Sequence, residues 1–455
     1  MTRRLVVPAI ALVFAASAPT FVGVASAQQP PPQQQEEPAE PEPKILDEAQ
    51  TRGLVGQFER AEHWTVQGLV IVSLGVSWHP SAASVFIAAI SGKSPELRAF
   101  AVEVLAKAND DCLLSTATPE LVEALIEDGL KVRDDHYSDT VLGILKRIFP
   151  EEDAKNRPQW QGRWHKLRET YEPTKWVAPP RKDEGPGRTV AGVVGRAMDL
   201  RESGLEICFC IDATGSMDPL LAATAGAAEQ VATLLEGFAP DLRVGAVFYK
   251  DMEDLSGGAK VIEELTDKTD KVFKKIGNLS AGGGGDIPEA VERGLEIALD
   301  PDEMGWKSTT NKLVIVMGDA PPHPPDVPRA EELARKAHET PLEAGKSGRR
   351  RPVTGDSKGE PRPFVVSCIG CGQGAVPGET ESAFKRIAEA GGGGYAALRL
   401  GPAVGKPDKD DKKLGASTRE IVGQVLSMSF GERFRDDMQV FLGIYFAYYE
   451  RGFFD

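Results

Sequence analysis

The chain has 455 residues, a length typical of two or three domains. Its 41% hydrophobic and 27% charged residues are those of an ordinary folded protein. The formal charge of −15 disfavours a nucleic-acid-binding protein, because such proteins neutralise phosphates with Lys and Arg. An acidic balance favours the attraction of cations instead.

The first 27 residues have the order of a secretory signal peptide. Arg3 and Arg4 precede an apolar run at 5–16, and small residues close the segment at 25–27. An uncleaved membrane anchor is the alternative, and the prolines in and after the apolar run disfavour it. We therefore expect cleavage after residue 27 and export to the periplasm or the extracellular space, without stable membrane insertion.

A predicted disordered spacer, rich in Pro, Gln and Glu, covers 28–47, and a predicted helical domain covers 48–172. Ser94-Pro-Glu and Thr118-Pro-Glu are helix starts of one design, with a hydroxyl N-cap, proline at the first helical position and then an acid. Short connections and wide apolar faces resemble HEAT-like repeats, and a non-repetitive helical domain fits the pattern nearly as well. Helices are predicted from Ser94 and at 63–75, 80–91, 119–132 and 138–149.

Residues 173–199 read as a linker, after which apolar strands alternate with helices over 200–416. Such alternation predicts an α/β fold with a doubly wound, mostly parallel, Rossmann-like sheet covered on both faces. The predicted strands are 205–211, 242–249, 260–265, 312–317, 363–369 and 395–400. The predicted helices are 219–237, 267–276, 287–299, 328–339 and 380–390.

Two polar insertions, 345–363 and 405–413, predict surface loops, and the first is basic enough to contact an anion. A C-terminal helical segment covers 417–455. It carries an apolar stripe that predicts docking on the sheet domain, formed by Phe434, Met438, Phe441, Leu442, Tyr445 and Tyr448.

Three loops carry oxygen-bearing side chains, and each follows a predicted strand or begins a predicted helix. They are DATGSM at 212–217, GGGGDIPE at 282–289 and MGDAPPH at 317–323. In an open parallel sheet, ligands bind outside the carboxyl ends of the strands, where the strand order reverses. Carboxylate and hydroxyl oxygens suit Mg²⁺, Mn²⁺ or Ca²⁺ rather than zinc or copper. The alternative is that the acids only stabilise the loops.

On these loops, residues 200–400 resemble the von Willebrand factor A (VWFA) family, most closely its hemicentin-like bacterial members. The metal-ion-dependent adhesion site (MIDAS) of that family has Asp-x-Ser-x-Ser on the first loop, Thr on the second and Asp on the third. The second loop departs from this pattern, since Gly285 stands where the Thr is expected and the neighbouring Asp is the replacement candidate. The resemblance implies metal binding by Asp212, Thr214, Ser216, Asp286 and Asp319.

A MIDAS-type site implies a function in protein binding, as an adhesion or scaffold module in which a partner's carboxylate completes the coordination of Mg²⁺. No phosphate-binding loop and no H-E-x-x-H motif occurs in the sequence, so we do not expect an enzyme. One alternative is a scaffold that binds through its helical domain and has a purely structural metal. The other is a metal-assisted hydrolase, which would need Glu289 or His323 as its base.

The five cysteines predict buried thiols rather than disulfides or a zinc site. Cys208 and Cys210 lie on one predicted strand, and Cys368 and Cys371 lie on another as the only C-x-x-C. The usual strand order of the VWFA family implies that the strand at 312–317 separates the two pairs. Two strand spacings exceed the reach of a disulfide.

Overall fold

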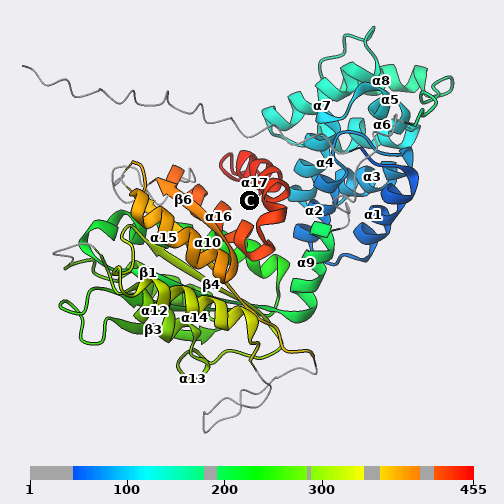
Figure 1. Ribbon diagram of the computed structural model, residues 1–455. Helices are drawn as coiled ribbons and strands as arrows, with labels where there is room; N and C mark the ends of the chain where they lie inside the picture. Colours follow the sequence, from blue (N-terminus) through cyan, green and yellow to red (C-terminus); the bar gives the residue numbers. More distant parts are fainter. Residues whose placement is uncertain are drawn as a thin grey trace, which may run out of the picture. The chain divides into compact units, whose positions relative to one another are not determined.

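The computed structural model describes residues 45–178, 192–283, 288–342, 359–372, 374–399 and 415–454 (Figure 1). The predicted signal peptide and most of the predicted spacer lie outside these ranges. The fold nevertheless begins earlier than residue 48. Ile45 pairs with Ser77 in an isolated bridge, Leu46 is fully buried, and the Asp47 carboxylate caps the first helix. Leu46 thus belongs to the core, and residues 45–47 belong to the fold and not to a spacer.

An all-helical region follows, as predicted. Ser94 and Thr118 are N-caps, and their hydroxyls accept hydrogen bonds from the amides of Leu97 (3.2 Å) and Leu121 (3.3 Å). Trp160 and Trp164 are buried on the last helix of the region. The elements are α1 (Glu48–Arg60), α2 (Trp64–Ser73), η1 (Pro80–Ala82), α3 (Ala83–Ser91), α4 (Pro95–Lys107), α5 (Asp110–Thr116), α6 (Pro119–Glu127), η2 (Gly129–Lys131), α7 (Asp135–Ile148) and α8 (Arg157–Leu167).

The predicted linker at 173–199 is wrong in its second half, because α9 (Gly192–Ser203) begins there. Its buried residues fall at helical spacing, and the helix packs on α2 and on two helices of the sheet region, α10 (Asp218–Phe238) and α16 (Ala416–Phe430). These residues are Val193, Val194, Ala197 and Leu200. The helical and sheet regions are therefore joined by a packed helix.

Six strands form one sheet in the order β3-β2-β1-β4-β5-β6. All neighbours are parallel except β3, which is antiparallel to β2. The strand order reverses between β1 and β4, so the predicted doubly wound, mostly parallel sheet is confirmed. The strands are β1 (Leu205–Asp212), β2 (Leu242–Tyr249), β3 (Ala259–Thr266), β4 (Asn311–Gly318), β5 (Phe364–Gly372) and β6 (Gly392–Arg399).

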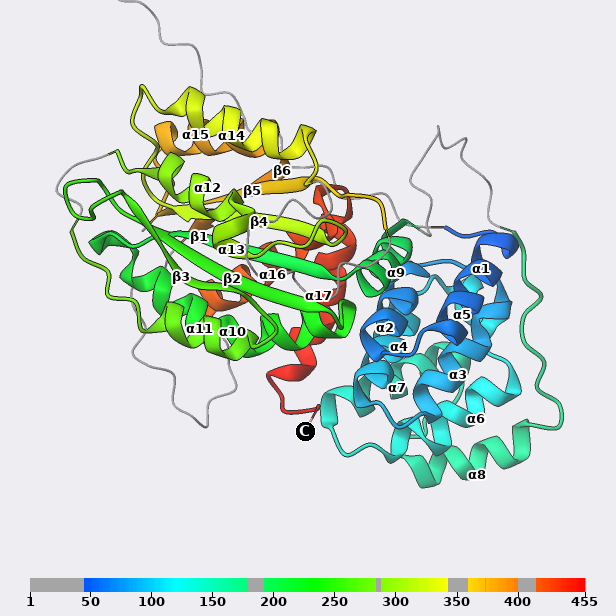
Figure 2. The same cartoon turned by 90° about the horizontal axis from the view of Figure 1, so that it is seen from below.

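Helices cover both faces of this sheet (Figures 1 and 2). The side chains of Ile207, Phe209 and Ile211 share a core with α10, α11 (Thr269–Gly277) and α16. Cys208 and Cys210 point to the other face, where they meet α12 (Val291–Leu299), α14 (Val327–Glu339) and α15 (Gly378–Ala390). The alternating direction of strand side chains thus divides one apolar strand between two cores.

All five cysteines are buried and free, as predicted. β4 lies between β1, with Cys208 and Cys210, and β5, with Cys368 and Cys371. Cys112 belongs to the helical region, where its thiol contacts the backbone of Trp78.

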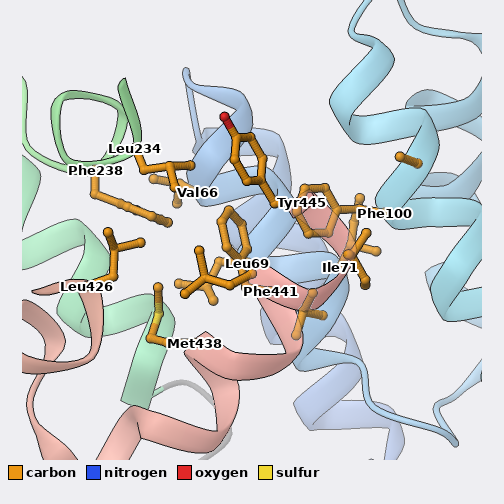
Figure 3. Close-up of a cluster of buried hydrophobic side chains, with 14 of the residues drawn as sticks. Val66, Leu69, Ile71, Phe100, Leu234, Phe238, Leu426, Met438, Phe441 and Tyr445 are labelled. Atoms are coloured by element: carbon orange, nitrogen blue, oxygen red, sulfur yellow. The ribbon is translucent and has the colours of Figure 1, made fainter. Parts of the chain in front are cut away.

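The C-terminal helices contact both regions of the chain. The chain ends in η4 (Glu432–Phe434) and α17 (Arg435–Tyr449), and α17 packs on α2 and α4 of the helical region as well as on α16 and on Phe238 of α10 in the sheet region. The ring centre of Phe441 lies 4.7 Å from that of Phe100 (Figure 3). It lies 6.3 Å from the ring centre of Trp64. The stripe docks there because α10 and α16 already cover this face of the sheet. One continuous core results.

Candidate metal centre

The first and third predicted loops begin at the same edge of the sheet. Asp212 is the last residue of β1, and Asp319 directly follows Gly318, the last residue of β4. The strands are parallel neighbours with Ile211 opposite Met317, so both acids leave the carboxyl ends of their strands side by side. This is also where the strand order reverses, the usual position of a ligand site in such sheets.

Asp212 has an unusual environment for a carboxylate. It is 0% exposed, and its Oδ1 accepts hydrogen bonds from the amide (2.8 Å) and the hydroxyl (2.6 Å) of Thr214. The Thr214 hydroxyl lies 3.4 Å from that of Ser216, which is exposed. Among the described residues, Oδ2 of Asp212 has no hydrogen-bond partner. The first loop therefore brings its three predicted ligands together and leaves one carboxylate oxygen unsatisfied.

Asp319 is half-buried beside this carboxylate, and its backbone carbonyl is held by the hydroxyl of Thr380 at 3.0 Å. A Cβ at Gly318 would lie 3.4 Å from Oδ2 of Asp212 and would collide with the hydroxyl of Tyr249. That hydroxyl is fully buried and donates to the carbonyl of Met317 at 3.2 Å. Glycine is therefore required at 318 for the two strand ends to approach each other.

The electrostatics of Asp212 favour a nearby positive charge. Burial raises its pKa to about 7, while the hydrogen bonds from Thr214 oppose that shift. The Asp319 carboxylate raises the pKa further and the Lys250 ammonium lowers it. Water screens the repulsion between the carboxylates of Asp212 and Asp319 only weakly, and a bound cation would offset that repulsion.

The second loop lies directly on the first. The amide of Gly282 donates to the carbonyl of Ala213 at 3.2 Å, and the amide of Gly215 donates to Gly283 at 3.3 Å. Lys250 donates to the carbonyl of Gly282 at 2.5 Å. Asp286, the predicted replacement ligand, and Gly285 lie outside the described residues.

Three further titratable residues lie near the site: Glu289, Asp251 and His323. Glu289 is 2% exposed, and its pKa is raised to about 8 by burial and then by Asp212 and Asp251. Its amide donates to the carbonyl of Pro321 at 3.0 Å, which ties the second loop to the third. His323 lies 3.3 Å from Asp251, so this imidazole is engaged with an acid. One feature of the sequence points to Glu289 as a residue of the site: it follows a run of four glycines and stands just before a helix.

The donor set suits a hard cation. Asp212 and Asp319 supply carboxylates, Thr214 and Ser216 supply hydroxyls, and all are oxygen ligands of the kind that Mg²⁺, Mn²⁺ and Ca²⁺ prefer. Within the described ranges, no group of three or more His, Cys, Asp or Glu side chains is arranged to hold a metal ion. Any cation here would therefore depend on the hydroxyls, on water and on the second loop.

The sequence matches no protein-family model and no curated protein sequence. Solved structures similar to part of the chain include the following two. The SpRpn10 VWA domain has 12% identity, covers 48% of this chain and 94% of its own, and has a TM-score of 0.32. The conserved hypothetical protein BatB from Bacteroides thetaiotaomicron has 16% identity, covers 50% and 99%, and has a TM-score of 0.31. At these scores, the fold assignment rests on the strand order and helix layers described above.

Proposed function

We propose that the chain is an exported, VWA-like protein-binding protein with a MIDAS-type divalent cation at the carboxyl ends of β1 and β4. The observation that carries the proposal is the buried Oδ2 of Asp212, which has no partner among the described residues and lies next to Asp319. A buried carboxylate without a partner is costly, and a bound cation would offset that cost. Thr214, Ser216 and the Asp286 expected from the sequence complete the donor set.

Binding of a partner follows from the geometry of such a site. Ser216 is exposed and Asp319 is half-buried, so a cation between them would face solvent on one side. Mg²⁺ keeps several waters in sites of this kind and exchanges one for an incoming oxygen ligand. We infer that a carboxylate of a partner protein replaces one such water.

A binding role is favoured over hydrolysis. A hydrolase needs a general base beside a metal-bound water, with a pKa near or below the working pH. Without a cation, burial and the neighbouring Asp212 and Asp251 raise the pKa of Glu289 to about 8. His323 lies 3.3 Å from Asp251, and such an acid-paired imidazole is the base that a hydrolase would use. We infer binding from the solvent-facing side of the donor set, and hydrolysis is the second candidate function.

Capture of partners from host extract tests this function. Wild-type protein with Mg²⁺ should retain a partner that EDTA releases and that Asp212→Asn fails to retain. Asp267→Asn, an exposed acid after β3, is the control and should behave as wild type. Retention that survives both EDTA and Asp212→Asn would instead favour binding through the helical region.

The export part is tested by mass spectrometry of protein from its native host, and an intact N-terminus in the cytosol would contradict it. Within the described ranges, no helix is long and apolar enough to cross a membrane.

A further inference from the structure

A cavity of about 510 Å³ lies at the opposite edge of the sheet from the candidate metal centre. Its wall includes the amino ends of β1, β4, β5 and β6, with α9 and the end of α16 closing the sides. This volume is in the range of pockets that hold small organic ligands. Neither the metal site nor the predicted partner surface uses this cavity.

The lining is strongly cationic although the whole protein is acidic. Four basic residues line the cavity: Arg196 of α9, Lys312 of β4, Arg362 just before β5, and Arg433 of η4. The Lys312 ammonium is buried and is held by the carbonyls of Ser308, Thr310 and Arg362, so the three arginines supply the accessible positive charge. Glu432 is the acidic lining residue, and Arg435 already binds it at 2.5 and 2.7 Å. The cavity therefore has a surplus of positive charge.

Two of the arginines are fixed in place by a shared acid. Asp199 accepts from Arg196 at 2.7 Å and from Arg362 at 2.7 and 3.0 Å. Both guanidinium groups also donate to Asn311. One carboxylate between two arginines neutralises only half of their charge. Burial lowers the pKa of Arg196, Asp199 opposes this, and the neighbouring Arg362 and Arg433 lower it further.

Arg433 differs from the other two arginines. It forms no ion pair with any residue in the described ranges, and its guanidinium lies 4.5 Å from the ring centre of Phe434. Stacking on an aromatic ring orients a guanidinium while its N–H donors remain available. This residue thus presents an oriented cation at the cavity without an acid of its own.

Apart from Asn311, Ser367 and Ser429, the remaining lining is apolar or without side chains. Gly392 has a φ of 66°, and a Cβ at Gly393 would collide with the Val366 carbonyl, so this stretch of β6 excludes side chains. Five aliphatic or aromatic residues complete the wall: Leu205, Leu313, Val365, Met428 and Phe430. A ligand that fills the cavity would meet cations at one part and apolar surface at another.

We propose that this cavity binds a small organic anion with a carboxylate or phosphate head and an apolar chain. Arg433 holds the head together with the fixed pair of Arg196 and Arg362, because guanidinium groups match both oxyanions in a fork geometry. The chain lies against the apolar wall. The proposal does not depend on the metal site.

Calorimetric titration of the full-length protein with decanoate and with decyl phosphate, both in EDTA, tests the inference. We expect at least one of the two probes to bind saturably, with one molecule per protein. Where both probes bind, they should compete for the same site. The tighter of the two identifies the head group. Decanol has the same chain without a charge and should bind much more weakly.

Arg433→Gln should weaken binding of the tighter probe by roughly tenfold, since it removes a charge-assisted hydrogen bond. The substitution should leave the melting temperature unchanged, because Arg433 is exposed. Arg335→Gln removes an equal charge from a surface pair with Glu332 on α14 and should have no effect. Absence of saturable binding, equal binding of decanol, or unchanged affinity in Arg433→Gln would overturn the proposal.

Discussion

Asp212 is completely buried, and its Oδ2 has no hydrogen-bond partner among the described residues. Its substitution is therefore a direct test of the metal site. Asp212→Asn should abolish calorimetric binding of Mg²⁺ and Mn²⁺, because it removes the carboxylate at the centre of the donor set. The fold should remain, since an uncharged amide is cheaper to bury than a carboxylate. The metal-free variant is thus expected to melt at or above the wild-type temperature.

The hydroxyl donors can be compared with the Asp212 carboxylate by their effect on cation affinity. Thr214→Ala and Ser216→Ala should weaken cation binding less than Asp212→Asn, and Asp286→Ala should cause a strong loss if that residue replaces the family's Thr. Asp267→Asn is again the control for a lost surface charge. Wild-type protein that binds neither cation at millimolar concentration would refute the metal site and the binding function derived from it.

A second buried acid has a structural role. Glu206, 0% exposed at the start of β1, accepts hydrogen bonds from Arg243, from the amide of Lys307 (2.9 Å) and from the hydroxyl of Thr310 (2.8 Å). Glu206→Ala leaves the largely buried Arg243 without its acidic partner and should reduce the free energy of unfolding by about 3–5 kcal/mol.

Urea denaturation of the Glu206→Ala variant measures this loss. The double variant Glu206→Leu/Arg243→Met should recover a large part of it, because breaking a buried pair costs more than replacing both partners by apolar groups. A double variant that is less stable than Glu206→Ala would show that the pair has a net stabilising role.

At the scale of elements, α17 joins the two regions. Phe441 is fully buried against α4 through Phe100, against α2 through Trp64 and against α10 through Phe238 at 5.5 Å. Phe441→Ala should cost about 3–5 kcal/mol, the usual range for a large core aromatic. It should also divide one thermal transition into two, because the helical and sheet regions lose their shared ring cluster.

Differential scanning calorimetry measures both effects. The matched control is Val440→Ala, a neighbouring residue on α17 that is 47% exposed and should change the melting temperature little. A single, unshifted transition in Phe441→Ala would contradict the joining role of the helix.

At the scale of the whole molecule, the five thiols report on global unfolding. Burial raises the pKa of Cys112 to about 11 and raises those of the other four cysteines well above the usual thiol value. Buried, protonated thiols react slowly with alkylating agents. Native protein at pH 8 should therefore incorporate almost no iodoacetamide within minutes.

Denatured, unreduced protein should incorporate five equivalents. Mass spectrometry gives both counts. A denatured count of three or one would reveal disulfides and contradict the separation of the two cysteine pairs by β4.

Local patterns along the chain were enough to predict the separate elements and the first loop of the candidate site. Apolar strands between helices have an unambiguous pattern, and all six strands were predicted within a few residues. Asp212, Thr214 and Ser216 are close in sequence, so their convergence follows from one strand end and one turn. The caps at Ser94 and Thr118 are equally local.

Which surfaces meet depends on the folded chain and not on any local pattern. The stripe on α17 is apolar in sequence, but its partner depends on which faces are still uncovered, and that is a property of the assembled layers. The burial of Asp212, the need for glycine at 318 beneath Tyr249, and the arginine cluster around Asp199 likewise join residues far apart in the chain. Periodicity and caps act over a few residues, whereas burial and charge pairing depend on contacts between distant segments.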